Sequence, residues 1–311
     1  MSAIVERHQY QQSATYRSFT SFETVYERTR TLDLGLARIL DTDIVTALTV
    51  AKTSSEFKDL ALATIPSLIK ILKKDTLLAN LPCLGIDTIS GEYQTNQGKD
   101  RLYVLAHRDH PLLSLNTLAR GLKRMDNRYF MPITQEETKQ LLKHAYSIRD
   151  LRRGVDWSDR TIIINLDKDN PFIYSGDRIG YDEWMRDDLI LAICGCEENR
   201  NWLGGQLKQR NFGDGFLNTM RMPDMPFGRT VGRLLSLDKD LNIEGTGKYR
   251  GAFLGITQNP EKTEEKKVLP PLEQILDVGS AYIADCNKGE YRLRMSALFE
   301  KIKNLENSSG G

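Results

Sequence analysis

The chain has 311 residues, and its 43 Lys and Arg against 42 Asp and Glu give a formal net charge of +1. This balance excludes a uniformly basic, histone-like protein and a uniformly acidic one, although charge can still separate locally. A hydrophobic content of 40% excludes a largely disordered chain, and the length is sufficient for one large domain or two ordinary ones.

The cysteines and the apolar runs limit the cellular setting. Four cysteines stand at positions 83, 194, 196 and 286, too few for a disulfide scaffold and without the Cys-x2-Cys pairs of structural zinc sites. The polar residues 1–12 lack the apolar region of a signal peptide, and no apolar run approaches the roughly 18 residues that span a bilayer. We therefore expect reduced thiols in a soluble, cytoplasmic protein without a membrane partner.

The first eighty residues predict a polar arm followed by a mainly helical region. Residues 1–20 are rich in Gln, Ser, Thr and Tyr, which indicates an extended arm. In residues 21–80, Thr20-x-x-Glu23 and Thr53-x-x-Glu56 have the spacing of a capping box, in which both side chains bind backbone N–H groups at a helix start. The apolar spacing extends these signals into helices over 22–40, from Thr53 to Ile65 and over 67–74.

Residues 81–258 predict a mixed α/β core region. A strand over 86–93 with a turn at Ser90-Gly91, a polar loop over 94–99 and a short strand over 102–106 come first. A loop begins at His107. The helices expected next run over 112–125 and from the capping box Thr134-x-x-Glu137 through Leu151.

The second half of this region combines one clear strand with a glycine-rich stretch. Residues 161–166 form a continuous β-branched run, which predicts a strand buried on both faces. Residues 182–196 favour a helix that ends near Gly195, and the apolar run 189–196 within them also fits a strand. Between 199 and 255 the density of glycine rises, which predicts short strands joined by turns.

The remaining residues complete the predicted organisation. Residues 259–306 indicate a charged linker and C-terminal helices, and residues 307–311 a flexible tail. The expected fold class is therefore α+β, with a mainly helical N-terminal region, a mixed α/β middle with a Gly-rich β segment, and C-terminal helices.

The near-neutral total conceals an alternation of charge through the middle of the chain. Residues 101–160 hold 12 basic and 7 acidic residues, residues 161–198 hold 3 and 9, and residues 199–255 hold 9 and 5. A basic surface built from the two Arg-rich segments would bind nucleic-acid phosphates, because the planar guanidinium matches a phosphate with two hydrogen bonds. The predicted phosphate contacts are Arg120, Lys123, Arg124, Arg128, Arg149, Arg152, Arg153, Arg221, Arg229, Arg233 and Arg250.

The same alternation has a second interpretation. The arginines of the basic segments can form ion pairs with the acidic segment that lies between them, and they then solvate the surface without contacting a ligand. The sequence leaves both interpretations open.

A loop after the strand over 102–106 offers candidate metal ligands. His107, Asp109 and His110 are close together in the sequence, and His and Asp are common ligands of divalent cations. Further carboxylates come from Asp167 and Asp169, which follow another strand, and from Glu197; in the alternative interpretation these carboxylates pair with nearby arginines.

These observations support three hypotheses about function. The leading one is a non-enzymatic nucleic-acid-associated subunit of a larger assembly, which contacts phosphates through segments 101–160 and 199–255. The alternatives are a metal-dependent hydrolase or nuclease that uses the loop of His107, Asp109 and His110, and a self-assembling shell or scaffold protein that binds copies of itself. The sequence assigns no cofactor.

Overall fold

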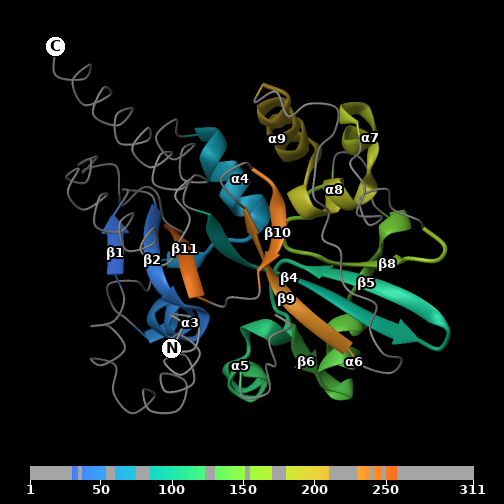
Figure 1. Cartoon of the computed structure of the whole chain (residues 1–311), viewed down its shortest axis with the longest axis horizontal. Coiled ribbons are helices and arrows are strands. Elements are labelled where there is room, and N and C mark those ends of the chain that lie inside the picture. Colours follow the sequence, from blue (N-terminus) through green and yellow to red (C-terminus); the bar gives the residue numbers. More distant parts are fainter. Residues whose placement is uncertain are drawn as a thin grey trace, which may run out of the picture. The chain divides into compact units, whose positions relative to one another are not determined.

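The chain divides into two compact units. The terminal unit comprises residues 1–62, 75–86 and 249–311, and the central unit comprises residues 63–74 and 87–248 (Figure 1). The computed structural model describes residues 30–33, 37–53, 60–74, 85–122, 130–150, 155–169, 180–209, 230–237, 241–246 and 250–257.

The terminal unit is an antiparallel sheet that joins strands from opposite ends of the described chain. β1 (Arg30–Asp33) pairs with β2 (Ala37–Asp43), and β2 pairs with β11 (Arg250–Thr257) in the register Leu40↔Phe253. β3 (Leu60–Leu62) pairs with β11 as well, and α3 (Ile44–Thr53) packs against these strands. The pairing of β2 with β11 therefore joins the N-terminal and C-terminal parts of this unit in one sheet.

The helices predicted over 22–40 and from Thr53 to Ile65 are wrong in their described parts. Ile39 and Leu40 are consecutive, and both are fully buried because β2 is a middle strand with apolar neighbours on both faces. Two consecutive buried residues are typical of a middle strand. Packing against the neighbouring strands favours this conformation more strongly than the imperfect helical spacing of the apolar residues favours a helix. Helix α3 ends at Thr53, where a helix was expected to begin; the helix expected over 67–74 is confirmed as α4 (Ile65–Lys74).

The central unit is built on a mixed sheet. β4 (Ile86–Gln97), β5 (Asp100–Ala106), β8 (Thr161–Asn165) and β7 (Tyr146–Ser147) lie in this order, and only β7 and β8 are parallel. β9 (Thr230–Leu237) pairs with β4, with β10 (Ile243–Thr246) and with β6 (Met131–Ile133).

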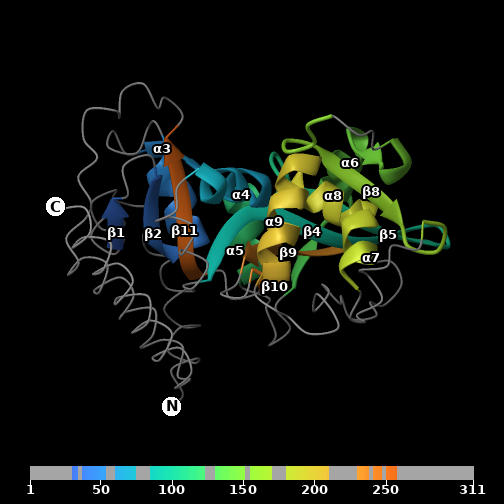
Figure 2. The ribbon, with the colours of Figure 1, turned by 90° about the horizontal axis from the view of Figure 1, so that it is seen from above.

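Helices cover this sheet. In the view of Figure 1, α4, α7 (Tyr181–Arg186), α8 (Asp188–Cys194) and α9 (Glu197–Gln209) lie above β4 and β5, and α5 (Leu115–Leu122), α6 (Gln135–Lys143) and β6 lie below them. Figure 2 shows α4, α8 and α9 side by side, and α8 and α9 each contact α4. Two 3-10 turns, η3 (Pro111–Leu113) and η4 (Ile148–Asp150), join these elements.

Several expectations for the central unit are confirmed. The strand over 102–106 is β5, and the helical residues 182–196 form α7 and α8, with Gly195 capping α8 at a left-handed φ of 78°. The capping box at Thr134 is formed, but its helix ends at Lys143 rather than at Leu151. β8 alternates between buried and half-buried residues, so the prediction that it is buried on both faces is wrong.

Two further differences concern segments that contain glycine. No turn forms at Ser90-Gly91, and β4 continues through the expected polar loop to Gln97, because residues 91–97 pair with β5. The segment 199–209 is helix α9 and not a strand; a Cβ at Gly204 would lie 2.9 Å from the Trp184 ring, so glycine here serves close packing between α7 and α9.

The mixed α+β class is confirmed, and the Gly-rich segment contributes the strands β9, β10 and β11. The predicted arm (1–20), the linker and C-terminal helices (259–306) and the tail (307–311) lie outside the described residues. Among the helices that the structure describes, none is long and apolar enough to cross a membrane.

Candidate functional site

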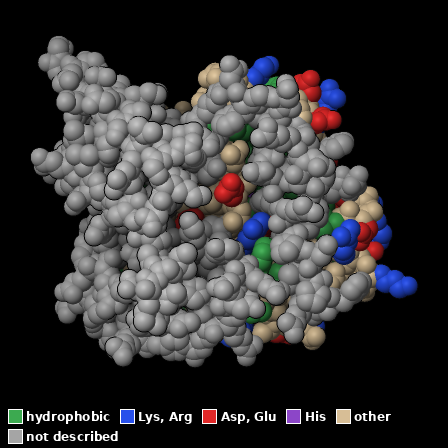
Figure 3. Space-filling model, viewed as in Figure 1, with side chains coloured by type: hydrophobic (Ala, Val, Ile, Leu, Met, Phe, Trp, Pro, Cys, Tyr) green, Lys and Arg blue, Asp and Glu red, His purple; other side chains and the backbone are tan. Residues whose placement is uncertain are grey.

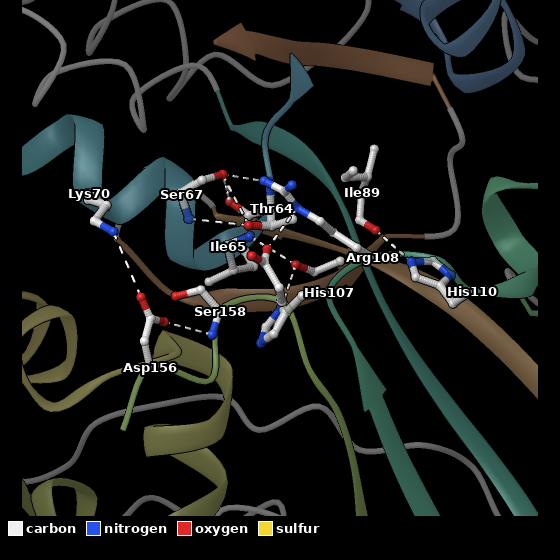
Figure 4. Close-up of polar contacts among 12 residues, drawn as sticks. Thr64, Ile65, Ser67, Lys70, Ile89, His107, Arg108, His110, Asp156 and Ser158 are labelled. Atoms are coloured by element: carbon white, nitrogen blue, oxygen red, sulfur yellow. Dashed lines mark hydrogen bonds and ion pairs between the residues drawn. The ribbon is translucent and has the colours of Figure 1, made fainter. Parts of the chain in front are cut away.

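His107 lies at the end of β5 and is fully buried. Its Nε2 donates to the carbonyl oxygen of Ala192 in α8 at 2.9 Å, which leaves Nδ1 as an acceptor. Ser90 Oγ, 2.9 Å from Nδ1, donates to it and accepts from the backbone N–H of Ile65 at the start of α4. Through these hydrogen bonds the His107 imidazole, drawn in Figure 4, links strands β4 and β5 to helices α4 and α8.

His110 is buried in a similar way three residues later. Its Nε2 donates to the carbonyl oxygen of Ile89 at 2.7 Å (Figure 4), and its Nδ1 accepts from the hydroxyl of Tyr93 at 2.5 Å. That hydroxyl accepts in turn from the backbone N–H of Leu112 at 3.3 Å. Gly91 makes room for the ring, because a Cβ there would lie 2.8 Å from its Cε1.

These contacts determine the chemistry open to the two histidines. Burial lowers the pKa of both His107 and His110 from 6.5 to about 4, so both rings are neutral near pH 7. A metal ligand or a proton acceptor needs a ring nitrogen with an open lone pair. Both nitrogens of each ring already have a hydrogen-bond partner inside the core, so each ring acts as a connector within the fold.

The other predicted metal ligands are exposed or are bound by arginines. Asp109 is exposed, with a positive φ of 52°, whereas Asp167 and Asp169 are bound by Arg101 and Arg149. In the ranges that the structure describes, no group of three or more His, Cys, Asp or Glu is placed to hold a metal ion. The metal site predicted at His107, Asp109 and His110, and the hydrolase based on it, thus gain no support from the described residues.

A buried ion pair joins β4 to β9. Glu92 is fully buried, accepts from Nε of Arg233 and accepts from the Tyr103 hydroxyl at 2.9 Å. Burial raises the pKa of Glu92, and the charge and hydrogen bond of Arg233 oppose that rise. The guanidinium also lies over the Phe130 ring, 4.8 Å from its centroid. Arg233, predicted to contact phosphate, is 13% exposed and is bound to a core carboxylate.

Arg120, a second predicted phosphate contact, supports the start of α6. Thr134 Oγ1 accepts from the N–H of Glu137, and the Glu137 carboxylate accepts from the N–H of Thr134, which completes the capping box. Arg120 and Thr117 also donate to this carboxylate, both at 2.6 Å. Burial alone would raise the pKa of Glu137, but these hydrogen bonds lower that pKa to about 2.

Arg149 differs from Arg120 and Arg233 in its exposure. Its side chain is 64% exposed, and its Nε donates to Asp169 at 2.6 Å. The other predicted phosphate contacts lie outside the described part of the structure: Lys123, Arg124, Arg128, Arg152, Arg153, Arg221, Arg229 and the side chain of Arg250.

Ion pairs connect the basic segment 101–160 with the acidic segment 161–198. Arg101 donates to Asp167 at 2.8 Å, and Arg149 donates to Asp169. Beside them Lys168 pairs with Asp100 at 2.7 Å. The interpretation that these carboxylates pair with nearby arginines is confirmed for Asp167 and Asp169. In Figure 3, basic and acidic side chains are interspersed among the described residues toward the right of the view.

The structure also reveals an exposed aromatic side chain that the sequence did not single out. Tyr146, in strand β7 at the end of the strand order, is 39% exposed. Its ring contacts the buried Trp157 edge to face, with centroids 5.7 Å apart. The guanidinium of Arg160 lies 5.2 Å from the Tyr146 centroid and donates to its hydroxyl at 3.1 Å. A Tyr in a short edge strand has no sequence signal that distinguishes it from a core residue.

Comparisons with known proteins bear on the fold only. No protein-family model and no curated protein matches this sequence. A solved structure described as "Accommodation of massive sequence variation in Nanoarchaeota by the C-type lectin fold" is similar, with a TM-score of 0.50 and 17% identity over 74% of this chain and 96% of that one. At that identity the likeness indicates a fold of the C-type lectin kind and carries no function with it.

Proposed function

We propose that this chain is a non-enzymatic binding subunit whose ligand is a nucleic acid. The observation that carries the proposal is the exposure of four arginines of segment 101–160: Arg101, Arg108, Arg149 and Arg160. Their guanidinium groups lie at the surface of the central unit, where a phosphate backbone has access to them.

The carboxylate partners of these arginines do not block this role. Arg108 pairs with Asp159 at 2.9 Å, and both side chains are about half exposed, at 44% and 65%. An exposed ion pair contributes only about 0–1 kcal/mol, so a phosphate can replace the carboxylate at small cost.

The non-enzymatic part of the proposal rests on the polar core. The groups that the sequence offers for acid–base or metal chemistry, His107 and His110 above all, are buried and have both ring nitrogens in hydrogen bonds. A binding surface carried on a fixed framework also agrees with the similar protein, whose C-type lectin fold is described as accommodating massive sequence variation.

The proposal is tested by a salt titration. Fluorescence anisotropy with labelled single-stranded and duplex oligonucleotides, from about 50 mM to about 200 mM NaCl, should give an affinity that falls steeply with salt, because phosphate contacts release counterions. An absence of binding at the lowest salt, or an affinity that does not depend on salt, overturns the proposal.

A matched pair of variants locates the contacts. Arg149→Gln removes an exposed charge within segment 101–160, and Lys74→Gln removes an exposed charge in the last turn of α4, outside it. The log–log salt slope should fall by about 0.7–0.9 for Arg149→Gln and stay unchanged for Lys74→Gln. Equal slopes for the two variants contradict a contact through this segment.

Association with copies of the chain stays a separate prediction, which light scattering of the purified protein tests.

A further inference from the structure

The surface around Tyr146 has the features of a stacking site. Among the described residues, Tyr146 and Val155 are the large hydrophobic side chains that are exposed, at 39% and 40%. Both belong to the stretch 143–160, which holds five Lys and Arg against three Asp. An aromatic ring within a basic stretch is the combination with which proteins hold single-stranded nucleic acid, since the ring stacks on a base while the cations bind the backbone.

The Tyr146 ring is held in place before any ligand arrives. Trp157, 5% exposed, supports the ring edge to face, and its own backbone N–H donates to the carbonyl oxygen of Gly195 at 2.6 Å. Arg160 lies over the ring and binds its hydroxyl. A ring fixed by two neighbours loses little conformational entropy when a base stacks on it, which favours binding.

The nearby acidic groups are already compensated in part. Asp159 is bound by Arg108, and Asp156 accepts from the backbone N–H of Ser158 and lies 3.9 Å from Lys70 (Figure 4). Arg149, three residues after Tyr146, is 64% exposed. Exposed cationic groups from the same stretch of chain as Tyr146 are therefore available to the phosphates of a strand whose base stacks on the ring.

We propose that Tyr146, with the guanidinium of Arg160, forms a stacking site for one unpaired base of a single-stranded nucleic acid. This inference rests on the proposed nucleic-acid function and specifies it, because a base paired within a duplex does not present its face to the ring. The site recognises the face of the base and hence discriminates little between sequences.

The test separates stacking from charge. A short oligo(dT) and an abasic oligonucleotide of the same length carry the same number of phosphates, so only the first can stack. For the wild-type protein we expect tighter binding of oligo(dT). In Tyr146→Ala this binding should weaken about tenfold, with an unchanged salt slope and unchanged binding of the abasic strand. Tyr146→Phe, which keeps the ring, should bind oligo(dT) within about twofold of wild type.

The outcomes distinguish this inference from the function on which it rests. If the wild-type protein binds neither strand, the proposed function fails and the stacking site with it. If it binds both strands equally, or if Tyr146→Ala binds oligo(dT) like wild type, only the stacking site is overturned. A Tyr146→Ala protein that changes its oligomeric state at constant nucleic-acid affinity shows that the ring contacts protein instead, which also overturns it. Circular dichroism and the urea midpoint of each variant establish that it is folded.

Discussion

Two regions of the central unit use the same residue types in opposite ways. In the buried region, His107, His110 and the pair Glu92–Arg233 have their polar atoms bound to core neighbours. At the exposed region, Arg108 and Arg149 hold aspartates while remaining largely in water. Burial decides the difference, because a polar group removed from water must find a partner inside the protein, and an exposed one exchanges partners freely.

The difference has a consequence for function. Replacing a partner in the buried region leaves a polar group without a hydrogen bond in a medium of low dielectric constant. These residues therefore serve the structure of the core and are not available to a ligand. Replacing a partner at the exposed region costs little, so those arginines are available to a ligand. We therefore expect stability to depend on the buried region and binding to depend on the exposed one.

The largest effect is expected from pH. His107 and His110 have a pKa of about 4 in the folded chain, against 6.5 for an ordinary histidine side chain in water. The unfolded chain therefore binds protons first as the pH falls, and the stability present above pH 6.5 is lost progressively toward pH 4. Between pH 7 and pH 5, above the titration of most carboxylates, the two rings together should cost about 4 kcal/mol, which urea unfolding measures.

A variant assigns this loss to the rings. His110→Gln, whose amide does not titrate, should show about half of the wild-type pH dependence. A stability that stays flat between pH 7 and pH 5 in the wild-type protein contradicts the buried, neutral state of the two histidines.

The next effect concerns the buried ion pair. Arg233→Met leaves the Glu92 carboxylate in the core with the Tyr103 hydroxyl but without a cation, and the free energy of unfolding should fall by about 3 kcal/mol. Removing both charges in Glu92→Gln/Arg233→Met should restore most of this loss. The cost of Arg233→Met should also shrink as the pH is lowered, because a protonated Glu92 no longer needs a cation. A double variant as unstable as the single one contradicts this account.

A smaller effect is expected at the start of α6. Thr134→Ala removes the oxygen that accepts from the N–H of Glu137, and it should lower the free energy of unfolding by about 1 kcal/mol. Thr134→Ser keeps this oxygen and serves as the control. Equal losses in the two variants, measured by urea unfolding, point to the methyl group of Thr134 rather than to the cap.

The cap also shows which features the sequence predicts well. Thr134 and Glu137 form a local motif whose geometry is complete within four residues, and its prediction is confirmed. The helix predicted over 22–40 is wrong in its described residues, because Ile39 and Leu40 lie in a strand that pairs with β11, more than two hundred residues away. Local signals report local structure, and strand pairing between distant segments overrides them.

The same limit applies to the candidate site. The composition of segment 101–160 predicts its cations, but nothing local indicates that Arg233 is bound to a buried glutamate on another strand while Arg149 stays exposed. His107 and His110 resemble metal ligands in the sequence because the partners that occupy their nitrogens, Ser90 and Tyr93 among them, come from β4. Burial of a polar side chain is a tertiary property, and one sequence does not report it.

The smallest effect on stability is expected at the exposed region. Arg108→Gln removes the partner of Asp159. The two side chains are 44% and 65% exposed, so water solvates the Asp159 carboxylate in place of the guanidinium. The free energy of unfolding should change by less than about 1 kcal/mol, and the change should shrink further at high salt, which screens exposed pairs. Arg233→Met is the buried counterpart, and its loss should persist at high salt. If Arg108→Gln destabilises the protein as strongly as Arg233→Met does, then its ion pair supports the fold, and Arg108 is not available to a phosphate.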